Sequence, residues 1–138
     1  MKKYLLLAFA LFLPLLTLAQ EQQNQPRINK KNLVIKEWNT DPKGGHKALD
    51  HVTTYSPEGW KLEETEYGSE GQKWRKRYER DASGKTVAEY VYDGKNRLQT
   101  CKKFEYNELG RKKVQYTYNA KGKLLSIKNF EYIAQAAD

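Results

Sequence analysis

A tyrosine followed four residues later by a glycine recurs along most of the chain, and this repeat constrains the fold more than any other feature. Complete copies are found at Tyr55–Gly59, Tyr67–Gly71, Tyr106–Gly110 and Tyr118–Gly122. Two degenerate copies lie between them, because Arg80–Gly84 keeps only the glycine and Tyr92–Asn96 keeps only the tyrosine. Successive copies begin 12 to 14 residues apart. This short, regular period predicts an array of repeated units, each made of one strand and one tight turn.

The residues within each copy have the chemistry of a tight turn. The final position is expected to take a positive φ, which glycine adopts without steric strain and asparagine tolerates. This explains why Asn96 can replace the glycine. The three residues before it are turn formers or polar, as in Asn119–Lys121. Between the turns, residue types alternate with the period of two that is typical of a strand.

The repeat predicts an all-β fold. We expect a single antiparallel meander of about eight strands, twisted or curled and built from 12–14-residue strand–turn repeats, because connections this short make neighbouring strands antiparallel. An additional hairpin is expected upstream of the repeats, around the loop of residues 40–45. The expected strands are Leu33–Trp38, Lys47–Tyr55, Trp60–Tyr67, Lys73–Arg80, Thr86–Tyr92, Arg97–Tyr106, Arg111–Tyr118 and Lys123–Tyr132.

Side-chain alternation counted along the chain predicts one aromatic face and one charged face. The residues expected on the aromatic face are Trp74, Tyr78, Tyr90, Tyr92, Leu98, Phe104, Tyr106, Val114, Tyr116, Tyr118, Leu124, Phe130 and Tyr132. Those expected on the charged face include Lys73, Arg75, Arg77, Glu79, Glu89, Lys103, Glu105, Gln115, Thr117 and Glu131. Aliphatic residues are too few for a packed two-layer interior, so the sheet is expected to curl over its rings or to remain an open layer.

The N-terminal segment, residues 1–19, is predicted to be a signal peptide. Lys2 and Lys3 precede the apolar stretch Tyr4–Leu18, and Thr17 and Ala19 suit cleavage by signal peptidase. The alternative is a membrane anchor, but the apolar stretch is shorter than the roughly 20 residues that a spanning helix needs. We therefore expect an exported protein, periplasmic or extracellular, without a transmembrane segment after cleavage. The expected remainder is a flexible leader (20–31), the repeat domain (32–133) and a tail (134–138).

The chain is basic and contains one cysteine. Its formal net charge is +8, and loss of Lys2 and Lys3 with a signal peptide lowers it to +6. For an exported protein, this charge points to acidic glycans, lipopolysaccharide or phospholipid head groups rather than to nucleic acid. The alternative is a solvated surface that keeps an exposed sheet soluble. Cys101 has no partner for an internal disulfide, which leaves a strand residue or an intermolecular bridge.

Three segments resemble a known bacterial repeat. The sequences YDGKNRL (Tyr92–Leu98), YNELGRK (Tyr106–Lys112) and YNAKGKL (Tyr118–Leu124) resemble the YD/RHS-type repeat, whose signature is Tyr-Asp-x-x-Gly-Arg/Lys-Leu. The resemblance extends over roughly Tyr55–Tyr132. Such repeats build β-hairpin strips in large bacterial cell-surface and toxin-delivery proteins, and some are linked to carbohydrate binding. The chain is also similar to small secreted bacterial repeat proteins of unassigned role. The resemblance therefore implies the local hairpin geometry.

The sequence offers little support for catalysis. His46 and His51 are five residues apart, a spacing that points them to opposite faces of one strand and argues against a shared metal. Glu64 and Glu66 are expected to share a face, as a glycosidase carboxylate pair would, but such pairs are also common on charged strands. We therefore predict a protein that is not an enzyme and has no catalytic residue, metal or cofactor. A secreted hydrolase is the least supported alternative.

The basic segment Lys73–Arg80 is the strongest candidate for ligand binding, because cations beside exposed rings can bind an acidic polysaccharide or a single-stranded nucleic acid. The alternative is a solvated cationic strand whose arginine stems cover neighbouring rings. We predict a binding or structural module at the bacterial envelope that binds glycans. Its expected ligand-binding residues are Trp74, Tyr78, Tyr90, Tyr92, Tyr116, Arg75 and Arg77.

The competing hypothesis is a module that binds another protein. An open meander leaves two edge strands, expected at Leu33–Trp38 and Lys123–Tyr132, and an unpaired edge invites strand addition.

Overall fold

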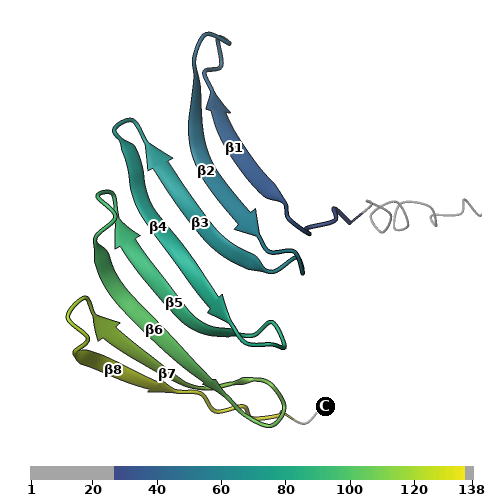
Figure 1. The fold of residues 1–138 in the computed structure, drawn as a ribbon, viewed down its shortest axis with the longest axis vertical. Coiled ribbons are helices and arrows are strands. Elements are labelled where there is room, and N and C mark those ends of the chain that lie inside the picture. The colour runs from purple at the N-terminus through teal and green to yellow at the C-terminus, as the bar shows by residue number, and fades with distance from the viewer. Residues whose placement is uncertain (1–26, 136–138) are drawn as a thin grey trace, which may run out of the picture.

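The protein is a single antiparallel sheet. The computed structural model describes residues 27–135, so the predicted signal peptide, most of the predicted leader and the last three residues of the predicted tail lie outside the described residues. The strands lie in chain order, and Figure 1 shows them in one curved layer from β1 at one edge to β8 at the other. The predicted all-β meander is confirmed. The strands are β1 (Val34–Thr40), β2 (Lys47–Tyr55), β3 (Lys61–Gly68), β4 (Gly71–Arg80), β5 (Thr86–Asp93), β6 (Leu98–Tyr106), β7 (Lys112–Asn119) and β8 (Leu124–Asn129).

The strand boundaries follow the sequence prediction closely. The bounds of β2 are those expected, and those of β1 and β3–β7 differ by at most two residues. The largest difference is at β8, which ends at Asn129, three residues before the expected Tyr132. Phe130 still donates its backbone N–H to the carbonyl of Lys113, so pairing with the neighbouring chain segment continues for one residue past the strand.

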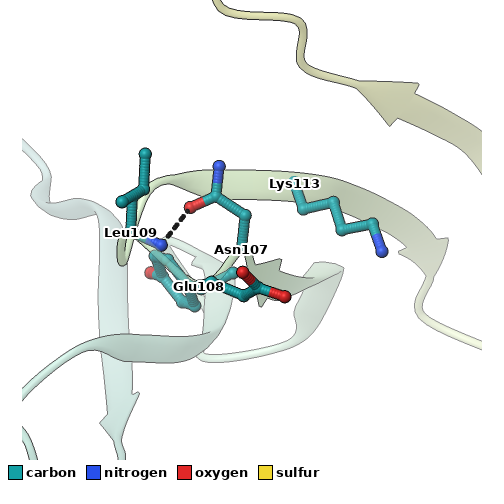
Figure 2. Close-up of a pocket in the computed structure, with 5 residues that line it drawn as sticks. Asn107, Glu108, Leu109 and Lys113 are labelled. Atoms are coloured by element: carbon teal, nitrogen blue, oxygen red, sulfur yellow. Dashed lines mark hydrogen bonds between the residues drawn. The ribbon is translucent and has the colours of Figure 1, made fainter.

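Five turns use one repeated hydrogen-bond pattern. In the turn after β7, the side-chain oxygen of Asn119 accepts the backbone N–H groups of Lys121 and Lys123 at 3.0 and 2.9 Å, and its carbonyl accepts that of Gly122 at 3.0 Å. Figure 2 shows the equivalent side-chain bond from Leu109 to Asn107. Similar turns begin at Ser56, Asp81 and Asp93. The prediction of positive φ at the last turn position is confirmed, since Gly122 has φ 81° and Asn96 has φ 58°.

The predicted separation into an aromatic face and a charged face is wrong. Tyr78 lies opposite Glu89 in the next strand, whereas Tyr90 lies opposite Arg77. Directly opposite residues of antiparallel strands share a face, so Tyr78 and Tyr90 point to opposite faces of the sheet. The cause is the hairpin itself: an even-numbered residue of β4 shares its face with odd-numbered residues of β5. Alternation counted continuously along the chain therefore assigns the wrong face at every hairpin in which opposite residues have different parity.

The register instead defines two mixed faces. We call the face with Arg75 and Arg77 the arginine face and the face with Glu64 and Glu66 the glutamate face. The arginine face includes Glu63, Thr65, Arg75, Arg77, Ala88, Tyr90, Tyr92, Cys101, Lys103, Glu105, Val114, Tyr116, Tyr118 and Ile127. The glutamate face includes His51, Thr53, Glu64, Glu66, Trp74, Lys76, Tyr78, Glu89, Val91, Thr100, Lys102, Phe104, Gln115 and Thr117. Rings and charges therefore occupy both faces.

The sheet has very little core. Strands contact only their neighbours in the sheet, and within residues 27–135 no side chain is completely buried. The buried hydrophobic residues are Ala88, Cys101, Phe104 and Val114, all of which lie on β5, β6 or β7. Stability must therefore come mainly from the hydrogen-bonded ladder and from cross-strand side-chain pairs rather than from a thick interior.

Side chains at the ends of β4 and β6, and one just past β8, donate to a carbonyl at the start of the preceding strand. The hydroxyl of Tyr106 donates to the carbonyl of Thr86 at 2.6 Å, and that of Tyr132 donates to the carbonyl of Lys112 at 2.8 Å. Arg80 makes the equivalent bond through its guanidinium to the carbonyl of Lys61, at 2.9 Å. Arginine can therefore replace tyrosine in the degenerate copy of the repeat, because both side chains reach and donate to the same kind of carbonyl.

Candidate ligand-binding faces

The residues predicted to form one glycan site are divided between the two faces. Arg75, Arg77, Tyr90, Tyr92 and Tyr116 lie on the arginine face. Trp74 and Tyr78 come from the same strand as the two arginines but lie on the glutamate face, opposite Glu66 or Glu89 in the neighbouring strands. A ligand that lies on one face cannot contact both groups.

Cations are stacked over rings along the arginine face. The guanidinium of Arg75 lies 4.4 Å from the ring centroid of Tyr92, and that of Arg77 lies 5.0 Å from the ring centroid of Tyr90. Each arginine is directly opposite its tyrosine in the β4–β5 register, which explains the pairing. Further along the face, the ammonium of Lys103 lies 5.6 Å from the ring centroid of Tyr118. These are cation–π contacts between adjacent strands.

The two arginines differ in how firmly they are held. Arg75 donates to the carboxylate of Glu63 at 3.0 Å and to the side chain of Asn96 at 3.2 Å. Arg77 donates only to Glu79, at 3.4 Å, and both side chains of that pair are about half exposed. Ion pairs at this exposure contribute little and exchange readily with solvent. Arg77 is therefore the more available cation of the two.

Two shallow hollows flank the Arg77–Tyr90 stack. One has a volume of about 310 Å³ and lies over β5, β6 and the turn after β7; its lining includes Tyr90, Leu98, Cys101, Lys103, Tyr118 and Asn119. The other has a volume of about 360 Å³ and is lined by Thr54, Leu62, Glu63, Arg77, Tyr78 and Glu79. Lys103 and Tyr118 were not among the predicted site residues. Pairing the strands through bulged hairpins, which puts Cys101 opposite Tyr118 and Lys103 opposite Tyr116, would have found them.

Burial controls ionisation inside the first hollow. Burial raises the pKa of Tyr90, and the nearby carboxylate of Glu79 raises it further. Burial also raises the pKa of the Cys101 thiol, which is only 8% exposed. A protonated, buried thiol is a weak nucleophile, so Cys101 contributes an apolar wall to the hollow rather than reactivity.

The glutamate face contains a compact ionic network around Glu64. Its carboxylate accepts a hydrogen bond from the hydroxyl of Tyr78 and another from the ammonium of Lys61 at 2.9 Å. The ammonium of Lys76 lies 3.6 Å away and the ring nitrogen of His51 lies 3.8 Å away. Burial alone would raise the pKa of Glu64, but the hydrogen bonds from Tyr78 and Lys61 and the charge of both lysines outweigh it and hold the pKa below its ordinary value.

The Glu64 network has the wrong electrostatics for a glycosidase acid. Glu64 and Glu66 share a face, as predicted, because they lie opposite Lys76 and Trp74 in the same pair of strands. A general acid needs a raised pKa so that it is protonated at working pH, whereas the pKa of Glu64 is lowered. Glu64 is thus placed to hold cations and the Tyr78 hydroxyl together across β3 and β4.

Trp74 is also engaged within the sheet. Its ring meets the ring of His51 edge-on, with centroids 5.8 Å apart and planes at 71°. The ammonium of Lys76 lies 5.0 Å from the Trp74 ring centroid. The Trp74 ring of the basic segment is therefore engaged in contacts within the sheet.

Other features carry less chemistry. A hollow of about 360 Å³ beside the β6–β7 turn is lined by Tyr106, Asn107, Glu108, Leu109 and Lys113, and Figure 2 shows that it is a feature of the turn. Residues 27–135 contain no cluster of three or more His, Cys, Asp or Glu side chains suited to a metal ion. In the same residues, no helix is long and apolar enough to cross a membrane.

The chain matches no protein-family model and no curated protein. The resemblance to YD/RHS-type repeats therefore stays a prediction, and the functional case depends on the geometry of the two faces and the two edges.

Proposed function

We propose that the chain is an exported, non-enzymatic binding module of the bacterial envelope and that its arginine face binds acidic glycans. The observation that carries this proposal is the row of cation–ring pairs across β4–β7, with a hollow on each side of the Arg77–Tyr90 stack. No second layer of the described chain covers this row.

The chemistry of the row suits a carboxylated or sulfated sugar chain. A sugar ring can pack against a tyrosine ring, while its anionic group pairs with a neighbouring cation. Tyr90 and Tyr118 line the same hollow as Lys103. Arg77, which is stacked on Tyr90, lines the second hollow. Tyr92 and Tyr116 extend the row on either side, and the guanidinium of Arg75 is stacked on the Tyr92 ring.

The experiment is a glycan array read at low and at high salt, followed by titration of any acidic glycan that binds. We expect binding to weaken with salt, since the interaction is partly ionic. Tyr90→Ala and Arg77→Gln should each weaken the affinity about tenfold, which corresponds to about 1.4 kcal/mol.

The matched control for these variants is Trp74→Ala. It removes a ring from the same basic segment, but from the glutamate face, so it should leave glycan affinity unchanged. Absence of any acidic-glycan binding, or an equal loss in Trp74→Ala and Tyr90→Ala, contradicts the assignment to the arginine face.

A second candidate function is protein binding through the sheet edges. It is favoured by one observation: all six residues of β8 are exposed, and so are six of the seven residues of β1. An unpaired edge of this kind presents backbone donors and acceptors to an incoming strand. Capture of a partner that is lost when an edge strand is blocked, but kept in Tyr90→Ala, would separate this function from glycan binding.

A further inference from the structure

Large apolar side chains are exposed on both edge strands, and several of them lie on the arginine face. On β1, Val34 is 51% exposed and Trp38 is 46% exposed. On β8, Leu124 is 43% exposed and Ile127 is 53% exposed. Leu124 and Ile127 lie opposite Tyr118 and Tyr116, and Val34 lies opposite Thr54, which places all three on the arginine face. Val34 and Trp38 are an even number of residues apart, so they share that face.

Each edge also offers unpaired backbone groups. Phe130 donates its N–H to Lys113 in the direction of β7. Backbone groups alternate in direction along an antiparallel strand, so the N–H and C=O of Ile127 and Asn129 face away from β7. On β1, the carbonyl of Leu33 accepts the N–H of Tyr55 in the direction of β2. By the same alternation, the backbone of Val34 and Lys36 faces the open edge.

The two ends of the sheet differ in charge. Residues 34–68, which contain β1–β3, have four lysines and seven acidic residues, a net charge of −3. Residues 98–129, which contain β6–β8, have eight basic and two acidic residues, a net charge of +6. Among the described residues, Arg27, Lys30 and Lys31 precede β1, and the ammonium of Lys30 lies 5.3 Å from the ring centroid of Tyr55 on β2. With these three cations, residues 27–68 have seven basic and seven acidic residues and no net charge, so the sheet runs from a neutral end to a strongly basic one.

The number of strands makes the two edges compatible in direction. With eight strands in an antiparallel meander, β8 runs opposite to β1. A second copy placed beside β8 in the same orientation would therefore add its β1 antiparallel to β8, with its arginine face on the same side. β1 has seven residues and β8 has six, so the two edges are also similar in length.

We propose that β8 of one copy pairs with β1 of the next, so that the chain assembles head to tail into a continuous sheet. This inference rests on the edge-binding function above and names its partner. Like-charge repulsion disfavours the competing arrangement, the pairing of two β8 edges, because it would bring two +6 segments together. Joining β8 to β1 also places Leu124 and Ile127 beside Val34 and Trp38 of the next copy. The interface is heterologous, so it can add copies without limit or close into a ring.

The experiment measures the mass distribution of the purified full chain by sedimentation velocity over a series of protein and salt concentrations. We expect species larger than the monomer to grow with protein concentration, because association follows mass action. A monomer at every concentration at low salt overturns the assembly. That result leaves glycan binding intact, since the glycan test uses residues of the arginine-face interior.

Two edge-blocking variants determine the geometry. Ile127→Pro blocks β8 and Lys36→Pro blocks β1, and each removes an N–H that faces the open edge rather than the neighbouring strand. Each variant alone should be monomeric. Their equimolar mixture should form a dimer and nothing larger, because one variant keeps an open β1 and the other keeps an open β8. A Lys36→Pro variant that forms dimers by itself would show β8–β8 pairing and overturn the head-to-tail arrangement.

Two further variants serve as a control and as a substitute for a proline variant that does not fold. Leu109→Lys removes an apolar side chain that is 78% exposed in the β6–β7 turn, away from both edges, and it should assemble like the original chain. Ile127→Lys replaces Ile127→Pro if circular dichroism shows that the proline variant is unfolded, because a charge within the apolar edge also disfavours strand addition. Assembly that persists in folded Ile127→Lys overturns the proposal.

Discussion

The first three and the last three strands are built from the same hairpin unit, yet they use their charges in opposite ways. Around β3 and β4, the carboxylate of Glu64 gathers Lys61 and Lys76, and other acidic residues are paired with Lys73 and Arg75. Among the residues that the structure describes, no salt bridge involves a side chain of β7 or β8. The carboxylates of β3 are neutralised within the sheet, whereas the cations of β7 and β8 form no ion pair among the described residues.

The difference teaches that the fold depends on its turns and its ladder rather than on ion pairs. The turn at Asn119 and the turn at Asp81 share one hydrogen-bond pattern, although they lie in regions of different charge. Side chains on the sheet surface can therefore vary without loss of the meander. Lys103 and the cations of β7 and β8 form no salt bridge among the described residues and remain available for a partner, and both functional proposals involve this end of the sheet.

Two turn glycines test the comparison most strongly. Gly84 and Gly122 have nearly equal φ values, 84° and 81°, but an added Cβ at Gly84 would lie 2.5 Å from the Trp60 ring, whereas at Gly122 it would meet nothing within 4 Å. We expect Gly84→Ala to lower the free energy of unfolding by about 3 kcal/mol, through backbone strain and overpacking. Gly122→Ala should lower it by about 1 kcal/mol, through strain alone. Urea denaturation measures both, and equal losses would show that the Trp60 contact is not important.

The next largest effect is expected at Glu64. Glu64→Gln leaves Lys61 and Lys76 without their shared carboxylate, and the hydroxyl of Tyr78 loses a charged acceptor. We expect a loss of about 2 kcal/mol in the free energy of unfolding. The control is Glu66→Gln, whose carboxylate has only an exposed pair with Lys73 and should contribute less than about 1 kcal/mol. Equal effects of the two substitutions would contradict a special role for the Glu64 network.

The sequence predicts the strands and turns well because both depend on local rules. A glycine or asparagine at the last turn position, and a residue with a side-chain oxygen five residues before the next strand, can be recognised in Asn119–Lys123 without any knowledge of the fold. The faces are not predictable by parity alone, because the bulge between Glu79 and Arg80 and its equivalents in other hairpins shift the register by one residue. Parity therefore predicts a shared face for Trp74 and Tyr90, whereas the register puts them on opposite faces.

The candidate site could likewise be predicted only in part from the sequence. Arg77 and Tyr90 could be proposed from their residue types, but Lys103 and Tyr118 could not, because their place in the hollow depends on the register of β5, β6 and β7. Likewise, the role of Arg80 as a substitute for tyrosine depends on its bond to the carbonyl of Lys61, which is nineteen residues away in the chain.

The pH dependence of stability should reveal the Glu64 network. Because the folded-state pKa of Glu64 lies below the ordinary value of 4.5, its stabilising contribution is present above that pH and is lost as the pH falls through the folded-state pKa. The contribution of Tyr78 has the opposite sign: its pKa is raised by burial and by Glu64, so its stabilisation is present below its ordinary pKa of 10.0 and declines as the pH rises above it. Each group contributes a slope of at most about 1.4 kcal/mol per pH unit.

Unfolding free energies measured from pH 3 to pH 6 test the predicted loss of stability at acid pH, the acid limb of the pH profile. Glu64→Gln should flatten that limb, whereas Glu66→Gln should leave it nearly unchanged. An acid limb of the same slope in Glu64→Gln and in the original chain would mean that another carboxylate controls stability there.

The smallest effect on stability is expected at the basic end. Lys123 directly precedes β8, and Lys128 lies within it. Neither takes part in a salt bridge among the described residues. The double substitution to glutamine should therefore change the free energy of unfolding by less than about 0.5 kcal/mol. It should nevertheless weaken self-association at low salt, because it removes the cation of β8 that can pair with the exposed carboxylate of Glu37 on β1 of the next copy. Lys76→Gln provides the matched contrast, since it removes a cation from the Glu64 network and should lower stability without changing assembly. A double variant that is destabilised as much as Lys76→Gln would show that the cations of β8 stabilise the sheet itself, and the contrast between the two ends would then disappear.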